Sequence, residues 1–125
     1  GFSVHAITRS QSSIDFALEH GLIDSGTTEI DPNLIGSADL AVFALYPHIF
    51  TQWLKDNGQY FKPGAVITDV TGVKSCIVYE IQEFLRSDVE FIAAHPMAGK
   101  EVYGVENADD KIFKKANYHI VKNTF

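Results

Sequence analysis

The sequence predicts an α/β fold, a Rossmann-like parallel sheet in which strands alternate with helices. Apolar runs typical of strands are separated by segments of helical periodicity along the 125 residues. The run DLAVFALY (39–46) is almost continuously apolar, which is typical of a strand buried on both faces of a parallel sheet. Because parallel strands need long crossover connections, right-handed strand–helix–strand units are expected.

The first residues are expected to form two strands joined by a capped helix. FSVHAIT (2–8) is rich in residues that favour strands, and TTEI (27–30) is a second, shorter candidate. Between them, Ser12 and Asp15 have the spacing of a helix cap, and Gly21 is expected to end that helix.

A second helix is expected after strand 39–46, opened by Pro47 and stopped by Gly58. Before that strand, the turn residues of DPNLIGSAD (31–39) leave room for at most one helical turn. The expected buried face of the helix consists of Ile49, Trp53 and Leu54.

The second half continues the alternation. KPG (62–64) is an expected turn, AVITDV (65–70) a buried strand and KSCIVYEIQEFLRS (74–87) a helix. VEFIAA (89–94) and NYHIV (117–121) are further strands, with a polar loop and a short helix between them. The apolar positions at helical spacing in 74–87 are Ile77, Ile81, Phe84 and Leu85.

One usual feature of a nucleotide-binding sheet is missing. Such a domain normally opens with a strand and a G-x-G-x-x-G turn, which places the cofactor pyrophosphate at a helix N-terminus. The sequence has no such motif and begins at what resembles a second strand. Residues 1–125 are therefore expected to be a partial NAD(P)-binding domain without its first strand and glycine-rich turn.

Composition narrows the class of protein. Hydrophobic residues make up 46% and charged residues 21%, which is ordinary for one globular domain. A net charge of −6 and ten scattered Lys and Arg residues argue against a nucleic-acid partner. No apolar run approaches the ~20 residues that span a bilayer, so no membrane partner is expected. The single cysteine, Cys76, fits a reducing compartment, and a cytoplasmic location is expected.

Polar residues collect at the carboxyl ends of four expected strands, where open parallel sheets bind their ligands. Each cluster alone is also compatible with an ordinary polar loop. Four of them at one edge of a sheet favour a binding site. They are TRS (8–10), YPH (46–48), DVTGVK (69–74) and HP (95–96).

His95 is the strongest acid/base candidate. Pro96 has no N–H to donate, so the strand is expected to stop there and to leave the imidazole at the sheet edge. An unperturbed imidazole has a pKa of about 6.5 and accepts protons near neutrality. The alternative is a structural histidine at a strand end. No metal site is expected, because the remaining histidines lack the spacing of metal ligands: His5, His20, His48 and His119.

The first cluster bears on the choice of cofactor. An acidic residue at the end of the second strand typically accepts hydrogen bonds from the ribose of NAD, whereas a nearby Arg accommodates the 2′-phosphate of NADP. Thr8 occupies that position, and Arg9 and Ser10 follow it. NADP is therefore the expected cofactor, with NAD possible. The alternative for Arg9 is a solvated side chain ahead of a helix cap.

Two motifs carry a family resemblance. DVTGVKS (69–75), followed by AHPMAGKEVYG (94–104), resembles the prephenate/arogenate dehydrogenase family of tyrosine biosynthesis. ALEHGLID (17–24), ADLAVFALYP (38–47) and IFKKANYHIVKN (112–123) fit the same order. The resemblance implies oxidative decarboxylation of prephenate or arogenate with hydride transfer to NAD(P)⁺. It also implies a C-terminal helical domain that forms a homodimer and closes the site, and that is not expected within these residues.

The resemblance further implies roles for individual residues. His95 matches the catalytic histidine, which accepts the proton of the substrate's ring hydroxyl. Many relatives have serine where this chain has Gly72, so either Thr71 replaces it or substrate handling differs. The expected substrate-binding residues are Thr71, Gly72, Lys74, Gly99 and Glu101. The expected cofactor-binding residues are Thr8, Arg9, Ser10, Tyr46, Pro47, Asp69 and Thr71.

Two other interpretations stay open. One is another NADP-dependent dehydrogenase of the 6-phosphogluconate-dehydrogenase-like group, which shares the strand order and the binding edge. The other is a non-catalytic nucleotide-binding or interaction domain, suggested by the missing first strand and by Gly72. His95 within HPMAGKE favours an enzyme. The alternatives for Lys74 and Glu101 are the start of a helix and a surface carboxylate.

Overall fold

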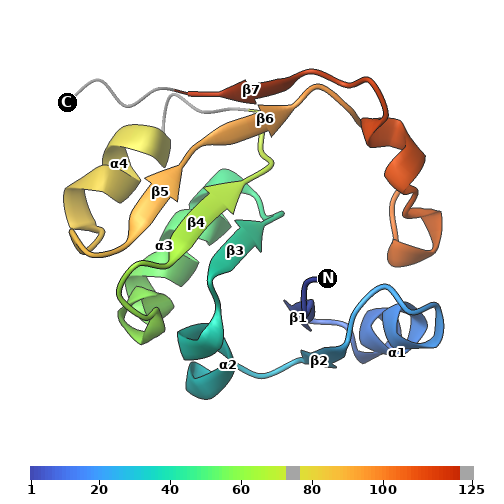
Figure 1. Ribbon diagram of the computed structural model, residues 1–125, viewed down its shortest axis with the longest axis horizontal. Coiled ribbons are helices and arrows are strands. Elements are labelled where there is room, and N and C mark those ends of the chain that lie inside the picture. The colour runs from blue at the N-terminus through green and yellow to red at the C-terminus, as the bar shows by residue number, and fades with distance from the viewer. Residues whose placement is uncertain (73–76, 122–125) are drawn as a thin grey trace.

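A computed structural model describes residues 1–72 and 77–121 and shows an α/β fold (Figure 1). The expectation of a wholly parallel sheet is wrong, because the last two strands of the described chain pair antiparallel. β1 (His5–Ile7) and β2 (Ser25–Thr27) form a parallel pair, and β3 (Leu40–Phe43), β4 (Val66–Asp69) and β5 (Glu90–Ile92) form a parallel sheet in that order. β6 (Ala94–Pro96) and β7 (Tyr118–Ile120) are the antiparallel pair.

Helices connect the parallel strands, as expected. They are α1 (Gln11–Glu19), α2 (Pro32–Ser37), α3 (Pro47–Asn57) and α4 (Ile77–Phe84), with 3-10 helices η1 (Gly58–Tyr60), η2 (Val105–Asn107) and η3 (Asp110–Phe113). α3 and α4 contact each other beside the three-stranded sheet, and η2 lies against α1 (Figure 1). Within the described ranges, no helix combines the length and the apolar character that crossing a bilayer requires.

α1 is capped two residues earlier than expected. Ser10, not Ser12, has the extended backbone of an N-cap, and its Oγ accepts a hydrogen bond from the Ser13 N–H at 3.3 Å. The expectation for Gly21 is confirmed. Its φ is +64°, and the next residue, Leu22, donates to the Ala17 carbonyl at 2.8 Å, which closes the helix in a left-handed C-terminal turn.

The buried face of α3 differs from the expected one by one residue. Phe50 and Leu54 are 0% and 2% exposed, whereas Ile49 is 45% exposed. Residues four apart share a helix face, so Phe50, rather than Ile49, lies in line with Leu54. Phe50 packs against Phe43 of β3, with ring centroids 4.5 Å apart, and against Phe91 of β5 at 5.8 Å. Trp53 is partly buried against the same core.

The segment between β2 and β3 also departs from expectation. The expected strand 27–30 ends at Thr27, because the Thr27 hydroxyl accepts a hydrogen bond from the Glu29 N–H at 3.0 Å and turns the chain. Asp31 then caps α2, accepting from the Asn33 and Leu34 N–H groups at 2.9 and 3.2 Å. With this cap, α2 extends over six residues, which is longer than one turn.

Pro96 does not end the strand ladder, contrary to expectation. The chain leaves β5 and continues as β6, where His95 pairs with His119 and Pro96 with Tyr118. The Val121 N–H donates to the Ala93 carbonyl, and the Met97 N–H donates to the Asn117 carbonyl. Hydrogen-bonded pairs alternate along an antiparallel ladder, so Pro96 falls at a pair that needs no N–H.

β1 and β3 are terminal strands of the two parallel sheets in the part of the chain that the structure describes. Among the described strands, β1 pairs only with β2, and β3 pairs only with β4. The exposed edge strand β3 carries Leu40 and Val42, which are 57% and 58% exposed. Figure 1 shows β1 and β3 as the neighbouring edges of the two parallel sheets. This is the position that the expected first strand would fill.

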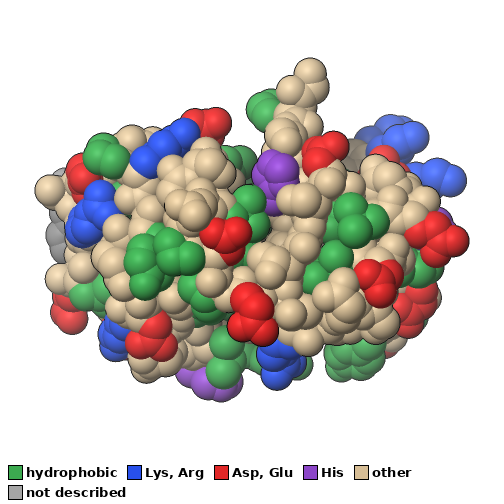
Figure 2. All heavy atoms as spheres, turned by 90° about the horizontal axis from the view of Figure 1, so that it is seen from below, with side chains coloured by type: hydrophobic (Ala, Val, Ile, Leu, Met, Phe, Trp, Pro, Cys, Tyr) green, Lys and Arg blue, Asp and Glu red, His purple; other side chains and the backbone are tan. Residues whose placement is uncertain are grey.

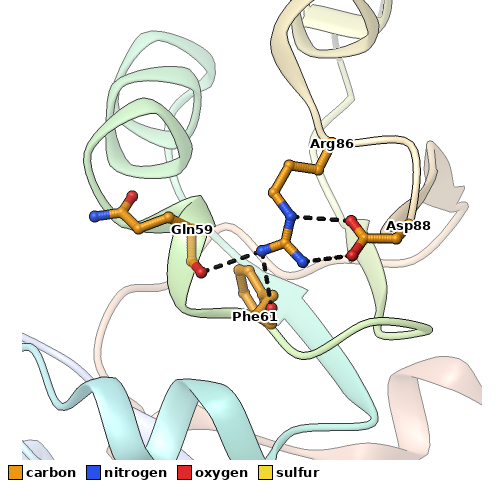
Figure 3. A network of polar contacts seen from close by, with 4 residues as sticks. All are labelled: Gln59, Phe61, Arg86 and Asp88. Carbon is orange, nitrogen blue, oxygen red and sulfur yellow. Dashed lines mark hydrogen bonds and ion pairs between the residues drawn. The ribbon is translucent and has the colours of Figure 1, made fainter.

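Arg86 forms hydrogen bonds to the segments that precede β4 and β5 (Figure 3). Its guanidinium donates to both carboxylate oxygens of Asp88, at 2.9 and 2.7 Å, and to the carbonyls of Gln59 and Phe61, at 3.1 and 3.0 Å. The bidentate hydrogen bond holds the pKa of Asp88 below its usual value. The carboxylate therefore keeps its charge to a lower pH than an unpaired aspartate does, and the contact is lost as the pH falls through this lowered pKa.

The corrected face of α3 generates a stability prediction. Phe50→Ala should lower the free energy of unfolding by about 3–5 kcal/mol, because it leaves a cavity among Phe43, Leu54 and Phe91. Ile49→Ala, on the exposed neighbouring position, should change it by no more than about 0.5 kcal/mol. Urea denaturation followed by circular dichroism measures both. Equal losses for the two variants would contradict the assignment of the buried face.

Candidate functional site

The carboxylate of Asp69 joins the end of β4 to the start of β6. Its side chain is 0% exposed. Oδ1 accepts a hydrogen bond from the Ala94 N–H at 3.3 Å, and Oδ2 accepts from the Thr71 N–H at 3.2 Å and from the Thr71 hydroxyl. Burial of a carboxylate is costly without such donors. Asp69 therefore fixes the turn after β4 against the chain that carries His95.

His95 lies against this turn. A Cβ atom built on Gly72 would be 3.5 Å from both Cε1 and Nε2 of the His95 ring. Along β6, Ala94 and Pro96 are buried, whereas His95 is half-buried, since successive side chains of a strand point to opposite faces. The imidazole thus lies beside the loop after β4, although the strand does not stop at Pro96 as the sequence predicts. Within the part of the chain that the structure describes, its ring nitrogens form no hydrogen bond.

The end of β3 lies at the same edge. Phe43, the last residue of β3, is in register with Asp69, and the Val70 N–H donates to the Phe43 carbonyl at 3.1 Å. Tyr46 and Pro47 follow at the start of α3, where Tyr46 is 71% exposed. The 69–72 cluster therefore lies against His95, and the 46–48 cluster follows β3 at the same edge of the sheet as that cluster.

The cluster after β1 stands apart from these three. The Thr8 N–H donates to the Thr27 carbonyl at 3.2 Å and so extends the β1–β2 ladder. Ser10 is occupied as the cap of α1. Arg9 is exposed and forms no hydrogen bond or ion pair with any described residue. No hydrogen bond between described residues joins this cluster to His95.

The remaining expected residues lie in loops. Gly99 and Glu101 are exposed in the segment between β6 and η2. The ion pair between Lys100 and Asp109, at 2.7 Å, connects this segment to the start of η3 and lowers the pKa of Asp109. Lys74 and Cys76 lie outside the described residues.

Sequence reasoning missed His119. It lies directly opposite His95 in the β6–β7 register and is exposed. The sequence predicts that His119 lies in a strand, but it does not predict that this strand pairs with the one that carries His95. Among the described residues, no group of three or more His, Cys, Asp and Glu side chains is arranged to hold a metal ion.

The distribution of charge is mixed. On the face shown in Figure 2, acidic and basic side chains are interspersed. The net charge of the sequence is −6.

Comparison with known proteins gives a consistent result. The family description "Prephenate dehydrogenase, nucleotide-binding domain" matches residues 1–122. The chain is 32% identical over 112 residues to a prephenate dehydrogenase of Lactococcus lactis subsp. cremoris, covering 88% of this chain and 31% of that protein.

Solved structures of prephenate and arogenate dehydrogenases superpose on this chain. The crystal structure of prephenate dehydrogenase from Aquifex aeolicus superposes with a TM-score of 0.88 at 26% identity, covering 98% of this chain and 44% of that one. Synechocystis arogenate dehydrogenase superposes with a TM-score of 0.85 at 26% identity, covering 96% and 41%.

The chain spans about a third of the length of the bacterial relative and less than half of each solved structure. The match nevertheless extends over almost all of these 125 residues, including both motifs and the edge that carries His95. The chain therefore belongs to the prephenate dehydrogenase family, as its nucleotide-binding domain.

Proposed function

We propose that this chain is the cofactor-binding part of an enzyme that oxidatively decarboxylates prephenate or arogenate and transfers hydride to NAD(P)⁺. Family membership supports the reaction class. The observation that carries the proposal is the His95 imidazole, half-buried against Gly72 at the ligand edge of the sheet. The Aquifex aeolicus enzyme has also been crystallised with hydroxyphenyl propionate and NAD⁺.

His95 would act as the general base. A bound nicotinamide would accept hydride from the ring carbon that bears the hydroxyl group, and carbon dioxide would leave from the different ring carbon that bears the carboxylate as the ring becomes aromatic. The His95 imidazole accepts a hydrogen bond from the ring hydroxyl and then its proton, which stabilises the carbonyl character that develops. Such proton transfer typically contributes about 10²–10⁴-fold to the rate.

Asp69 and Thr71 would act by positioning. The Asp69 carboxylate is enclosed and bonded to Ala94 and Thr71, so its contribution to cofactor or substrate binding passes through the turn it holds. Thr71 and Gly72 would line the substrate side of His95, and Gly99 and Glu101 would border its mouth. The same proposal extends to Lys74, which lies outside the described residues.

The chain has residues that fit a dinucleotide. Arg9, exposed and free of partners among the described residues, is available for the 2′-phosphate of NADP beside Thr8 at the end of β1. Ser10 would contribute through α1, which it caps, and Tyr46 and Pro47 would meet the cofactor at the start of α3. NADP is therefore the proposed cofactor, with NAD as the other candidate.

We also infer that these residues work together with further parts of a longer enzyme. The open edges of β1 and β3 fit one additional parallel strand with a glycine-rich turn. A helical domain that forms the homodimer would close the substrate site. Two alternatives were a dehydrogenase of the 6-phosphogluconate-dehydrogenase-like group and a non-catalytic nucleotide-binding domain. Gly72 and the lack of the expected first strand remain the observations that favour the second, and no further observation favours either.

Replacement of the base tests the reaction. In the full-length protein that carries this chain, His95→Asn should lower kcat on prephenate or arogenate by about 10²–10⁴-fold. His20→Asn is the control and should retain full activity, since the His20 imidazole is bonded to the Phe16 carbonyl of α1 and stacks on the Phe16 ring. The rates with each substrate are measured from the absorbance of the reduced cofactor, with NADP⁺ and with NAD⁺. An unchanged rate in His95→Asn would contradict the catalytic assignment.

Gly72 offers a gain-of-function test. A Cβ there would make ordinary 3.5 Å contacts with the His95 ring, so Gly72→Ser should fold with unchanged stability. Its hydroxyl would supply one hydrogen bond to substrate, which should raise kcat/KM by up to about tenfold. Gly72→Ala adds the Cβ without the hydroxyl and should leave kcat/KM unchanged. An equal effect of both substitutions would exclude the hydrogen bond as the cause.

The open edges predict weak cofactor binding by the 125 residues alone. Without a strand between β1 and β3, the chain has no glycine-rich turn to hold the pyrophosphate. Calorimetric titration with NADP⁺ should therefore show no binding in the micromolar range. Micromolar affinity would show that the described edges suffice, contrary to this proposal.

A further inference from the structure

The β6–β7 ladder places two imidazoles side by side. His95 and His119 are directly opposed residues of this antiparallel pair, which Figure 1 shows as adjacent strands. Side chains of directly opposed residues leave the ladder on the same face, with Cβ atoms about 4.5–5.5 Å apart. The two residues are 24 positions apart in the sequence (119 minus 95), so only the folded chain brings them together.

Both imidazoles have free nitrogen atoms. The ring of His5 is bonded to the hydroxyls of Ser25 and Ser3, at 2.7 and 2.9 Å, and His20 Nδ1 is bonded to the Phe16 carbonyl at 2.8 Å. Within the described ranges, the rings of His95 and His119 form no hydrogen bond at all. Their lone pairs are therefore available to a ligand, and the exposure of His119 gives that ligand access from solvent.

We propose that His95 and His119 form a binding site for a divalent transition-metal ion such as Ni²⁺ or Zn²⁺. Neutral imidazole is a preferred ligand of these ions, at metal–nitrogen distances of about 2.0–2.1 Å. Two imidazoles mounted about 4.5–5.5 Å apart can converge on one ion, and water completes its coordination. Because the described residues supply no third side chain of the usual kinds, the ion is an exchangeable ligand.

The consequence for activity rests on the proposed function. A metal ion bound to His95 occupies the lone pair with which this imidazole would accept the substrate proton. Divalent transition metals should therefore inhibit the enzyme, and removal of His119 should relieve the inhibition without removing the base. Binding itself does not depend on catalysis and is measured separately.

Titration of the tag-free chain with NiCl₂ by calorimetry tests the site. We expect one ion per chain, and at least about tenfold weaker binding in His95→Gln and in His119→Gln. His119→Val, which retains a residue that favours strands, should behave like His119→Gln. His48→Gln is the matched control, because His48 has no opposed histidine, and should bind as the wild type does. Wild-type affinity in His119→Gln would overturn the proposal.

Nuclear magnetic resonance of the unmodified chain gives a readout that does not depend on the folding of any variant. Paramagnetic Ni²⁺ should broaden the imidazole signals of His95 and His119 together, at lower concentration than those of His5, His20 and His48. Broadening of His95 without His119 would exclude the shared site. If Ni²⁺ binds in this way but the protein oxidises neither prephenate nor arogenate, the metal site stands and the proposed function fails.

Discussion

The buried carboxylate of Asp69 is the contact on which the geometry of the site depends. It is the last residue of β4, and its hydrogen bonds reach the turn that follows β4 and the first residue of β6. A buried carboxylate requires donors, so these bonds leave the two segments little freedom to separate. The position of His95 beside Gly72 follows from this connection. The site thus depends on a side chain that does not itself face solvent.

The antiparallel return of β7 is the second constraint. It pairs with β6 in a two-stranded sheet that follows β5 in the chain, and it runs in the direction opposite to β6. Ala94 and Pro96 lie inward and His95 outward because side chains alternate along the strand. Pro96 is compatible with this pairing because its position in the ladder needs no N–H. The same register brings His119 beside the candidate base.

The sequence predicted those features that depend on local pattern. The alternation of strands and helices, the end of α1 at Gly21 and the opening of α3 at Pro47 follow from periodicity and turn chemistry. Features that depend on a partner elsewhere in the chain were not predictable in this way. Phe50 faces the core because Phe43 and Phe91 meet it there, and only the strand order reveals those contacts.

The errors have the same origin. Ser12 and Ser10 are equally suitable caps in composition, and the choice depends on where β1 ends and releases the backbone. The cofactor contact expected of Asp69 stays a prediction, but its hydrogen bond from the Ala94 N–H, 25 residues later, was not predictable from its place at the end of a strand. The sequence did not predict that His119 lies opposite His95, because which residues face each other across two strands depends on their register.

A double-mutant cycle of Asp69→Asn and His95→Asn in the full-length enzyme tests most directly whether the buried carboxylate acts by positioning the base. Asparagine is nearly isosteric but replaces one acceptor oxygen with a donor, so Asp69→Asn should lower kcat/KM by about tenfold or more in the wild-type background. In the His95→Asn background the same substitution should have almost no further effect, because nothing remains to be positioned. An equal loss in both backgrounds would contradict the account.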